Sequence, residues 1–260
     1  MKISALPKLF LTVFMYCAIA VQAQTARTSY ERPNDPRMFE TYTAFQESKL
    51  LESMRGTVLR RFNVENVLSL SFRNCGQSNA VYRSDVKEII MCWELLGSVI
   101  DSSARRFSSN RDHLINASIS TFIFILYHEL GHALVDLKKT PTFGREEDNA
   151  DQIAALLMLE DNLKKNHAES NVAMLGVFDF WQANNNQYLS KHELTGQHSL
   201  GQQRAYNVIC WAIGSDPISR YKHLSRLTNF PIQRIDSCIK EYQRATTALN
   251  DLVIQSGSRR

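Results

Sequence analysis

The sequence predicts an α+β fold that is mostly helical, in which a small N-terminal β-sheet packs on a central helix and a helical C-terminal part follows. Residues 67–72 alternate apolar and polar side chains, a pattern typical of a half-buried strand, and further short strands are expected at 81–82 and 88–92. Residues 112–137 are apolar nearly all round in their first half, as expected of a helix buried in a sizeable core. Most of the remaining chain shows apolar residues at helical spacing.

The first 23 residues have the composition of a secretory signal peptide. Lys2 and Lys8 give a positively charged start, Leu9 to Val21 form an apolar run, and Val21-Gln22-Ala23 provides a small-x-Ala cleavage pattern. The apolar run is about 13 residues long, short of the roughly 20 that a membrane-spanning helix needs, although an uncleaved anchor is the alternative. We therefore expect an exported protein, periplasmic or secreted, with no stable membrane insertion after cleavage.

The rest of the chain is expected to form one domain. Removing residues 1–23 takes away two of the 30 basic residues and leaves 26 acidic ones, so the net charge falls from +4 to +2. A charge this small and dispersed argues against a nucleic-acid partner. About 237 residues remain, enough for one large domain. We expect a flexible leader at the polar residues 24–37, a single domain at 38–253 and a disordered tail at 254–260.

Four cysteines lie beyond the predicted signal peptide, an even number that favours two disulfides in an exported chain. Three pairings are possible, and sequence proximity favours Cys75 with Cys92 and Cys210 with Cys238. A zinc ion held by cysteines is the competing interpretation, but the chain contains no C-x-x-C pair. The cysteines therefore predict disulfides and an oxidising compartment.

The first part of the domain is predicted to be a helix followed by three strands. Phe45, Leu50 and Met54 recur at helical spacing over residues 39–54, and Gly56 ends the pattern. Short strands, separated by turn-like polar residues, are then expected at 67–72, 81–82 and 88–92.

The second part of the domain is predicted to be helical. A helix at 94–107 precedes the long helix at 112–137, after which Pro141 and Gly144 break the pattern. The aromatic residues of the run 178–181 are expected to belong to the core rather than to a substrate cleft. Further helices are expected at 146–165, 171–182, 201–213, 217–227 and 231–253.

The long helix carries two histidines that stand one helical turn apart. His128 and His132 are four residues apart, so both imidazoles project from the same face of a helix and can bind one metal ion. Glu129 lies between them and completes an H-E-x-x-H pattern, in which the glutamate acts as general base. Such polar side chains are costly on a buried helix unless a partner satisfies them, and a metal ion does so. We therefore expect a Zn²⁺ site here.

A third protein ligand must come from elsewhere, because two histidines make only half of a tetrahedral site. Glu147, which opens the next predicted helix, is the favoured candidate. Asp151 stands four residues later on the same face, where it can accept a hydrogen bond from a zinc-binding histidine. Asp136, four residues after His132, is an alternative ligand or a second carboxylate that supports a histidine. Glu146 is a further alternative, although it points about 100° away from the face of Asp151.

These residues resemble those of a known clan of zinc peptidases. The pattern His128-Glu129-x-x-His132 with Glu147-x-x-x-Asp151 is similar to the gluzincins, in which a downstream Glu is the third ligand and an Asp one turn later supports a histidine. More closely, a family of exported bacterial metallopeptidases is similar over most of residues 60–245, through HELGHALVDL…GREEDNADQIA, CGQSNAVY…EIIMCWEL and HSLGQQRAYNVICW…GSDP. The resemblance implies zinc and a zincin-like fold, in which a sheet edge above the zinc helix binds an extended peptide.

The expected function is an exported zinc-dependent peptidase that acts on a peptide or protein. Zn²⁺ lowers the pKa of bound water and polarises the scissile carbonyl, and Glu129 would pass the proton of that water to the leaving amine. His198 is the candidate donor to the oxyanion, because similar segments with a following Arg occur in some gluzincins; Tyr206 is a weaker candidate. The alternative places His198 at a helix entry, with Ser199 as N-cap and Arg204 in a structural ion pair.

Two other functions remain open at the level of the sequence. One is a non-catalytic zinc-containing binding or scaffold protein with the same fold, and the other is a zinc hydrolase of a non-protein amide. An intact Glu129 favours an enzyme, because a pure binder has no need of a base beside its ligands. The sequence leaves cleavage specificity and oligomeric state open.

Overall fold

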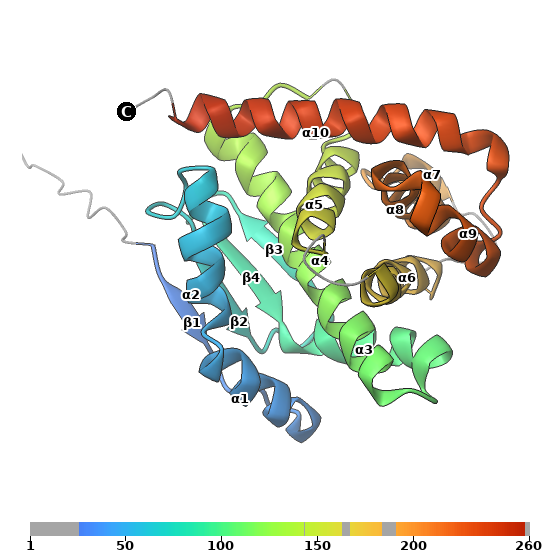
Figure 1. Ribbon diagram of the computed structural model, residues 1–260. Coiled ribbons are helices and arrows are strands. Elements are labelled where there is room, and N and C mark those ends of the chain that lie inside the picture. The colour runs from blue at the N-terminus through green and yellow to red at the C-terminus, as the bar shows by residue number, and fades with distance from the viewer. Residues whose placement is uncertain (1–25, 143, 163–166, 184–190, 258–260) are drawn as a thin grey trace, which may run out of the picture.

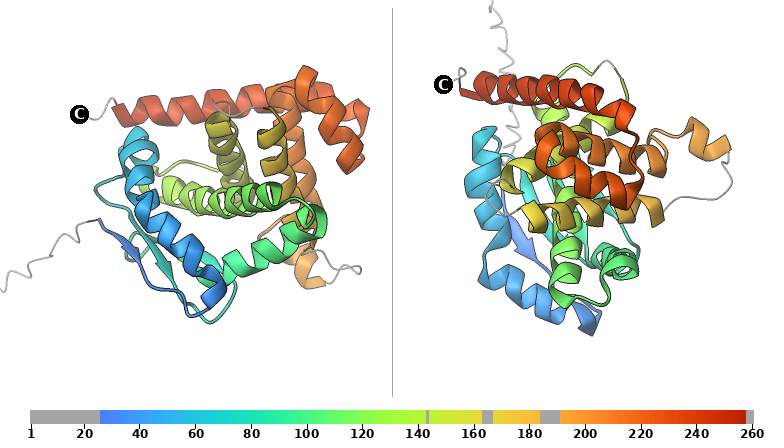
Figure 2. Two further views of the ribbon diagram at one scale, coloured as in Figure 1. Left: turned by 60° about the horizontal axis from the view of Figure 1, so that its bottom comes forward. Right: turned by 45° about the vertical axis from the view of Figure 1, so that its right-hand side comes forward.

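The computed structural model describes residues 26–142, 144–162, 167–183 and 191–257, so the predicted signal peptide lies outside the described residues. The described chain is mostly helical and carries one four-stranded sheet, which agrees with the predicted α+β class. Figure 1 shows the sheet and the first helices on one side of the molecule and the later helices on the other, with helix α4 (Arg111–Lys138) between them. The left view of Figure 2 shows α4 lying lengthwise inside the fold.

The sheet has the strand order β1-β2-β4-β3. β1 (Thr28–Tyr30), β2 (Ser69–Arg73) and β4 (Glu88–Cys92) run parallel, whereas β3 (Ala80–Arg83) pairs antiparallel with β4 and forms an edge. Because β3 packs against α4, the open edge of the sheet faces the second half of that helix. Side chains that alternate along the two inner strands project from one face into the core; these are Leu70, Phe72, Ile89 and Met91.

The N-terminal segment is part of the fold, so the predicted flexible leader at 24–37 is wrong for the residues that the structure describes. Residues 28–30 form β1 along β2, and Pro36–Met38 form a 3₁₀ helix, η1. Trp93 Nε1 donates a hydrogen bond to the carbonyl of Glu31 at 2.8 Å. The partners of this segment come from distant parts of the chain, and its polar composition does not reveal them.

The predicted helix at residues 39–54 is divided into two. α1 (Phe39–Glu47) ends before Lys49, whose φ of 50° is left-handed, and α2 (Leu50–Met54) follows. The glycine expected to end the helix lies inside η2 (Arg55–Leu59), a π-helical turn. One left-handed residue is enough to stop a helix, and apolar spacing does not show it.

Helix α3 (Trp93–Phe107) leads from the sheet into α4, which has 28 residues. The Asn110 side chain caps α4 by accepting a hydrogen bond from the His113 N–H at 3.0 Å. By length and hydropathy α4 could cross a membrane, but 72% of its most apolar window is buried inside the fold. Its central position therefore accounts for its apolar sequence.

A glycine brings α5 (Glu146–Asn162) close to α4. A Cβ atom at Gly131 would lie 2.7 Å from Cα and 3.0 Å from Cβ of Ala150, closer than real side chains approach. Gly131 directly precedes His132, and Ala150 directly precedes Asp151. The close contact therefore places the acidic start of α5 opposite the histidines of α4.

The described chain after α5 is helical, with one element that the sequence does not predict. α7 has only five residues and carries no periodic signal. The last helix continues through Gly257, so the described start of the predicted disordered tail at 254–260 is helical. These elements are α6 (His167–Ala183), α7 (Lys191–Thr195), α8 (Gly201–Ser215), α9 (Pro217–Thr228), the 3₁₀ helix η3 (Ile232–Arg234) and α10 (Ile235–Gly257).

The four cysteines lie in the two pairs that sequence proximity favours. The sulfur atoms of Cys75 and Cys92 are 2.03 Å apart, and those of Cys210 and Cys238 are 2.00 Å apart. The first disulfide ties the loop before β3 to the end of β4, and the second ties α8 to α10. Disulfides of this kind persist in oxidising compartments.

Candidate metal centre

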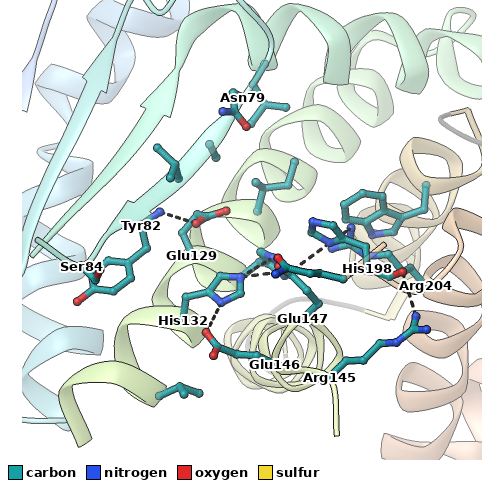
Figure 3. Close-up of a pocket in the computed structure, with 18 of the residues that line it drawn as sticks. Asn79, Tyr82, Ser84, Glu129, His132, Arg145, Glu146, Glu147, His198 and Arg204 are labelled. Carbon is teal, nitrogen blue, oxygen red and sulfur yellow. Dashed lines mark hydrogen bonds and ion pairs between the residues drawn. The ribbon is translucent and has the colours of Figure 1, made fainter. Parts of the chain in front are cut away.

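Two imidazole nitrogens and one carboxylate oxygen converge between α4 and α5 (Figure 3). Nε2 of His128 lies 3.2 Å from Nε2 of His132 and 3.1 Å from Oε2 of Glu147, and His132 Nε2 lies 3.4 Å from the same oxygen. Ligands at bond lengths of about 2.0–2.1 Å form a tetrahedron with edges of about 3.3–3.4 Å. The three atoms therefore have the spacing of donors to one tetrahedral metal ion.

One oxygen of the Glu147 carboxylate lacks a hydrogen bond. Its Oε2 is buried and accepts no hydrogen bond from any described residue, although imidazole nitrogens of His128, His132 and His198 lie within 3.4 Å. Burial raises the pKa of Glu147, but these imidazoles outweigh it and hold the pKa far below its usual range. An ionised, buried oxygen without a hydrogen bond fits a metal ligand.

A carboxylate lies behind each of the two histidines. Nδ1 of His128 is 2.9 Å from Oδ1 of Asp151, and Nδ1 of His132 is 2.7 Å from Oε1 of Glu146. With its proton on Nδ1, each imidazole presents an unprotonated Nε2, which is the form that a metal requires. The sequence predicts this arrangement for Asp151. Glu146, expected as an alternative third ligand, lies instead on the outer nitrogen of His132.

Asp151 is itself held by a buried arginine from α8. Nε and Nη2 of Arg204 each donate to one oxygen of Asp151 at 2.7 Å, and the two residues are 6% and 2% exposed. Burial raises the pKa of the Asp151 carboxyl, but Arg204 and His128 outweigh it, so the pKa is lowered. The guanidinium also lies over the ring of Trp181, 3.4 Å from its centroid. Arg204 therefore fixes the carboxylate that orients His128.

Glu129 lies between the histidines and the edge strand (Figure 3). The backbone N–H of Tyr82 donates to Glu129 Oε2 at 2.6 Å. Glu129 is 7% exposed, and burial raises the pKa of its carboxyl against the opposing effect of His128 and His132. A raised pKa suits a carboxylate that must take up and release a proton near neutral pH.

A family described as "Putative metallopeptidase" matches residues 30–253, which is most of the chain. The chain belongs to this metallopeptidase family. Membership implies a metal cofactor and a peptide substrate, and the donor set between α4 and α5 fits a metal. No curated protein and no solved structure matches the chain significantly.

Asp136 has partners other than the expected ones. Its carboxylate accepts hydrogen bonds from the Tyr82 hydroxyl at 2.6 Å, from Lys87 Nζ at 2.5 Å and from Lys139 Nζ at 3.2 Å. Hydrogen bonds from Lys87 and Tyr82 lower the pKa of Asp136 to about 2. Its described partners include neither a histidine nor Glu147. The predicted role as ligand or histidine support is therefore wrong, because the side chain leaves α4 towards β3.

His198 lies at the metal centre, on the side opposite Tyr82 (Figure 3). Its Nδ1 is 3.0 Å from Glu147 Oε2 and 3.3 Å from Nη1 of Arg204, and its side chain is 54% exposed. Nη1 of Arg145 donates to the His198 carbonyl at 3.0 Å. His198, the predicted catalytic histidine, thus lies beside the candidate metal centre, and two arginines hold its position.

Two other expectations near α8 are wrong. Leu200, rather than Ser199, is the residue that precedes the helix, and the Ser199 hydroxyl donates to Asp148 at 2.6 Å. Tyr206 donates its hydroxyl hydrogen to the carbonyl of Thr228 at 3.0 Å and does not line the cavity at the metal centre. Tyr206 therefore cannot serve as the alternative donor.

The metal centre opens into a cavity of about 1040 Å³. β3 borders it on one side, and the start of α5 and the segment before α8 border it on the other (Figure 3). Phe180 belongs to the buried core and Trp181 packs against it, as expected, but both side chains also line this cavity. Leu95, Ile125, Phe180 and Trp181, from α3, α4 and α6, contribute large apolar side chains to its wall, and Ala80, Val81 and Val135 add smaller ones.

Sequence reasoning missed three polar neighbours of the site. Tyr82 and Lys87 come from the β3–β4 hairpin, and Arg145 immediately precedes α5. The hydrogen bonds of the hairpin residues to Glu129 and Asp136 join positions 47 to 54 residues apart. No local pattern marks such contacts. The one available signal was the sheet edge that the family resemblance implies.

Proposed function

We propose that the protein is an exported zinc-dependent peptidase in which His128, His132 and Glu147 hold Zn²⁺. The observation that carries this proposal is the spacing of their three donor atoms, 3.1 to 3.4 Å from one another. Two imidazoles and one carboxylate suit zinc, and catalytic sites use three protein ligands with a fourth position for water or substrate. Zinc at such a site lowers the pKa of a coordinated water and polarises a carbonyl.

Glu129 is the proposed general base. The Tyr82 N–H holds its Oε2, which leaves Oε1 to take a proton from the attacking water and to pass it to the leaving amine. A positioned base of this kind contributes about 10²- to 10⁴-fold to the rate. Replacing Glu129 by glutamine removes the base and retains the shape of the side chain.

His198 is the proposed donor to the oxyanion. Arg204 Nη1 lies 3.3 Å from Nδ1 of His198. An N–H donor beside Nδ1 favours the tautomer that carries its proton on Nε2, and Nε2 can then donate a hydrogen bond to the substrate. The contact of the same Nδ1 with Glu147 favours the opposite tautomer. A cation bound to the Glu147 oxygen weakens that competition, because it neutralises the negative charge that attracts a proton to Nδ1.

The open edge of β3 is the proposed binding strip for the substrate backbone. The Cys92 N–H donates to the Asn79 carbonyl at 3.1 Å, and bonded pairs alternate along an antiparallel ladder. Backbone groups of Ala80 and Tyr82 therefore point away from β4, and the bond from Tyr82 to Glu129 agrees with this direction. An extended peptide can add to such an edge as a further strand.

The direction of β3 predicts how a peptide would lie. Lys87, which directly precedes β4, contacts Asp136 late in α4. Phe72, which pairs with Met91 near the end of β4, contacts Phe122 in the first half of α4. β4 therefore runs opposite to α4, and β3 runs along it. A peptide pairs more stably with an edge strand in the antiparallel sense, so its chain would run against α4.

This direction points to a substrate class. The residues that follow the cleaved bond would lie towards the first half of α4, where the cavity wall is apolar. We therefore propose cleavage before a large apolar residue, recognised by the wall of Leu95, Ile125, Phe180 and Trp181.

The decisive experiment measures zinc content and proteolysis of an unfolded protein by the wild type and by Glu129→Gln. We expect equal zinc in both proteins and at least about a hundredfold lower turnover in the variant. Equal turnover in both proteins would remove the mechanism. Stoichiometric zinc without turnover in the wild type would favour the non-catalytic scaffold instead.

Export is tested separately, by sequencing the N-terminus of the mature protein after expression with the complete chain. The two disulfides support an oxidising destination. Cleavage after Ala23 is the expected result, and a cytoplasmic protein that retains Met1 would contradict it.

A further inference from the structure

One residue of the edge strand contacts α4 at two points. The backbone N–H of Tyr82 donates to Glu129 Oε2 at 2.6 Å, and its hydroxyl donates to Asp136 Oδ2 at 2.6 Å. Glu129 and Asp136 stand seven residues apart, about two turns or about 10.5 Å along the helix, so they share one face. Tyr82 therefore spans the part of α4 that begins with the proposed base.

Lys87 adds a second attachment from the same hairpin. It lies at the turn between β3 and β4 with a φ of 51°, and its Nζ donates to Asp136 Oδ2 at 2.5 Å. The Lys87 carbonyl accepts a hydrogen bond from the Ser69 N–H in β2 at 2.9 Å, so this turn is also fixed to the sheet. The Asp136 side chain is 24% exposed. One partly buried carboxylate thus holds the edge strand and the end of its hairpin.

We propose that Asp136 is a positioning residue of the peptidase site. Through the Tyr82 hydroxyl and the Lys87 ammonium it holds β3 against α4, and it thereby keeps the Tyr82 N–H on Glu129. This inference rests on the proposed function, because it assigns Asp136 a part in orienting the general base. Tyr82 and Asp136 both line the cavity, so the same contacts set the gap that receives the substrate.

A charged acceptor suits this role better than a neutral one. The same oxygen of Asp136 accepts from a phenol and from an ammonium group, and hydrogen bonds to a carboxylate are about twice as strong as neutral ones. An asparagine would keep a carbonyl oxygen but lose the attraction to Lys87. Asp136→Asn should therefore weaken the attachment without removing side-chain volume.

The experiment compares the full-length, zinc-loaded wild type with Tyr82→Phe and Asp136→Asn. Tyr82→Phe removes one hydroxyl and leaves the backbone N–H that faces Glu129. In both variants we expect amide hydrogen exchange at residues 80–83 to accelerate about tenfold, because the strand loses a hydrogen bond to a charged group. We expect kcat per bound zinc to fall about tenfold and KM to rise, with zinc content unchanged. A loss of global stability alone would not produce this pattern well below the unfolding temperature.

Two substitutions serve as matched controls. Asp85 pairs with Arg83 in the same hairpin at 2.5 Å, in an exposed ion pair that does not involve α4. Lys139 binds Asp136 at 3.2 Å, but it follows α4 directly in the chain and its side chain is 82% exposed. Asp85→Asn and Lys139→Gln should therefore keep wild-type exchange at residues 80–83 and wild-type kinetics.

Wild-type exchange and kinetics in Tyr82→Phe would overturn the proposal. Loss of zinc from Asp136→Asn would also overturn it, because Asp136 would then belong to the metal centre. If the wild type cleaves no peptide, the proposed function fails, and hydrogen exchange still tests the attachment. Accelerated exchange would then support the positioning of β3 by Asp136, and unchanged exchange would refute it.

Discussion

Replacing Glu146 by glutamine tests the carboxylate behind His132. Glu146 Oε1 lies 2.7 Å from His132 Nδ1, so the substitution exchanges a charged acceptor for a neutral amide of the same size. Loss of a carboxylate in this position costs about 10- to 100-fold in metal affinity, because the histidine becomes less basic and less well oriented. The Glu146 side chain is 48% exposed, and solvent weakens its charge, so we expect a loss near the lower limit, about tenfold.

Asp151 provides the buried counterpart of the same interaction. Its side chain is only 3% exposed, and Arg204 depends on it for charge compensation. Asp151→Asn should therefore reduce zinc affinity by about 100-fold, at the upper end of the range for such carboxylates. We therefore expect the more buried carboxylate, Asp151, to contribute more to zinc affinity than Glu146.

Competition with a chromophoric chelator, at constant pH and ionic strength, measures the zinc dissociation constants. Asp148→Asn is the matched control, because it removes the same charge from the first turn of α5 while its carboxylate binds the Ser199 hydroxyl. We expect this control to change the affinity less than about twofold. Equal losses in Glu146→Gln and Asp148→Asn would refute the reasoning, since net charge rather than the contact with His132 would then set the affinity.

Asp136 should also stabilise the fold against acid. Its pKa of about 2 lies below the value of about 3.9 in an unfolded chain, so about 2 kcal/mol of stability is present above about pH 4 and is lost as the pH falls towards 2. Urea unfolding of Asp136→Asn should lack this part of the pH dependence, and parallel curves for the two proteins would contradict it. Gly131→Ala should lower the free energy of unfolding by about 2 kcal/mol and weaken zinc binding, because the new Cβ would lie 2.7 Å from Ala150 Cα. A wild-type Tm together with a wild-type zinc affinity would refute this prediction. Trp181→Ala should reduce the preference for a large apolar residue after the cleaved bond about tenfold in a peptide library. An unchanged preference would show that the apolar wall does not bind that residue.

Local geometry explains what could be predicted from the sequence. Residues four apart share a face in any α-helix, so the spacing of His128 and His132 indicates a shared metal wherever the helix lies in the fold. The same rule places Glu147 and Asp151 on one face of the following helix. The strand predicted at residues 67–72 is also visible as an alternating pattern, because that alternation depends only on the chain's own period.

Long-range contacts explain what the sequence did not reveal. β1 was expected as part of a flexible leader, because the strand with which it pairs lies about 40 residues away in the sequence. Trp181 was expected in the core, although α6 brings it to the cavity and against Arg204. In both cases the local sequence pattern gives no signal. The role of β1 depends on its pairing with β2, and the role of Trp181 depends on where α6 packs.

The acidic residues of the site show this division most clearly. The sequence by itself determined that a helix carries two histidines and a glutamate, and that a group of acids follows them. It left Glu146 and Asp136 as competitors of Glu147, because spacing along a helix gives a direction and not a partner. Only the tertiary structure places Glu146 on His132 and Asp136 on Tyr82, through contacts that span 14 and 54 residues. The reason is that the docking of α5 and β3 on α4 sets which side chains meet.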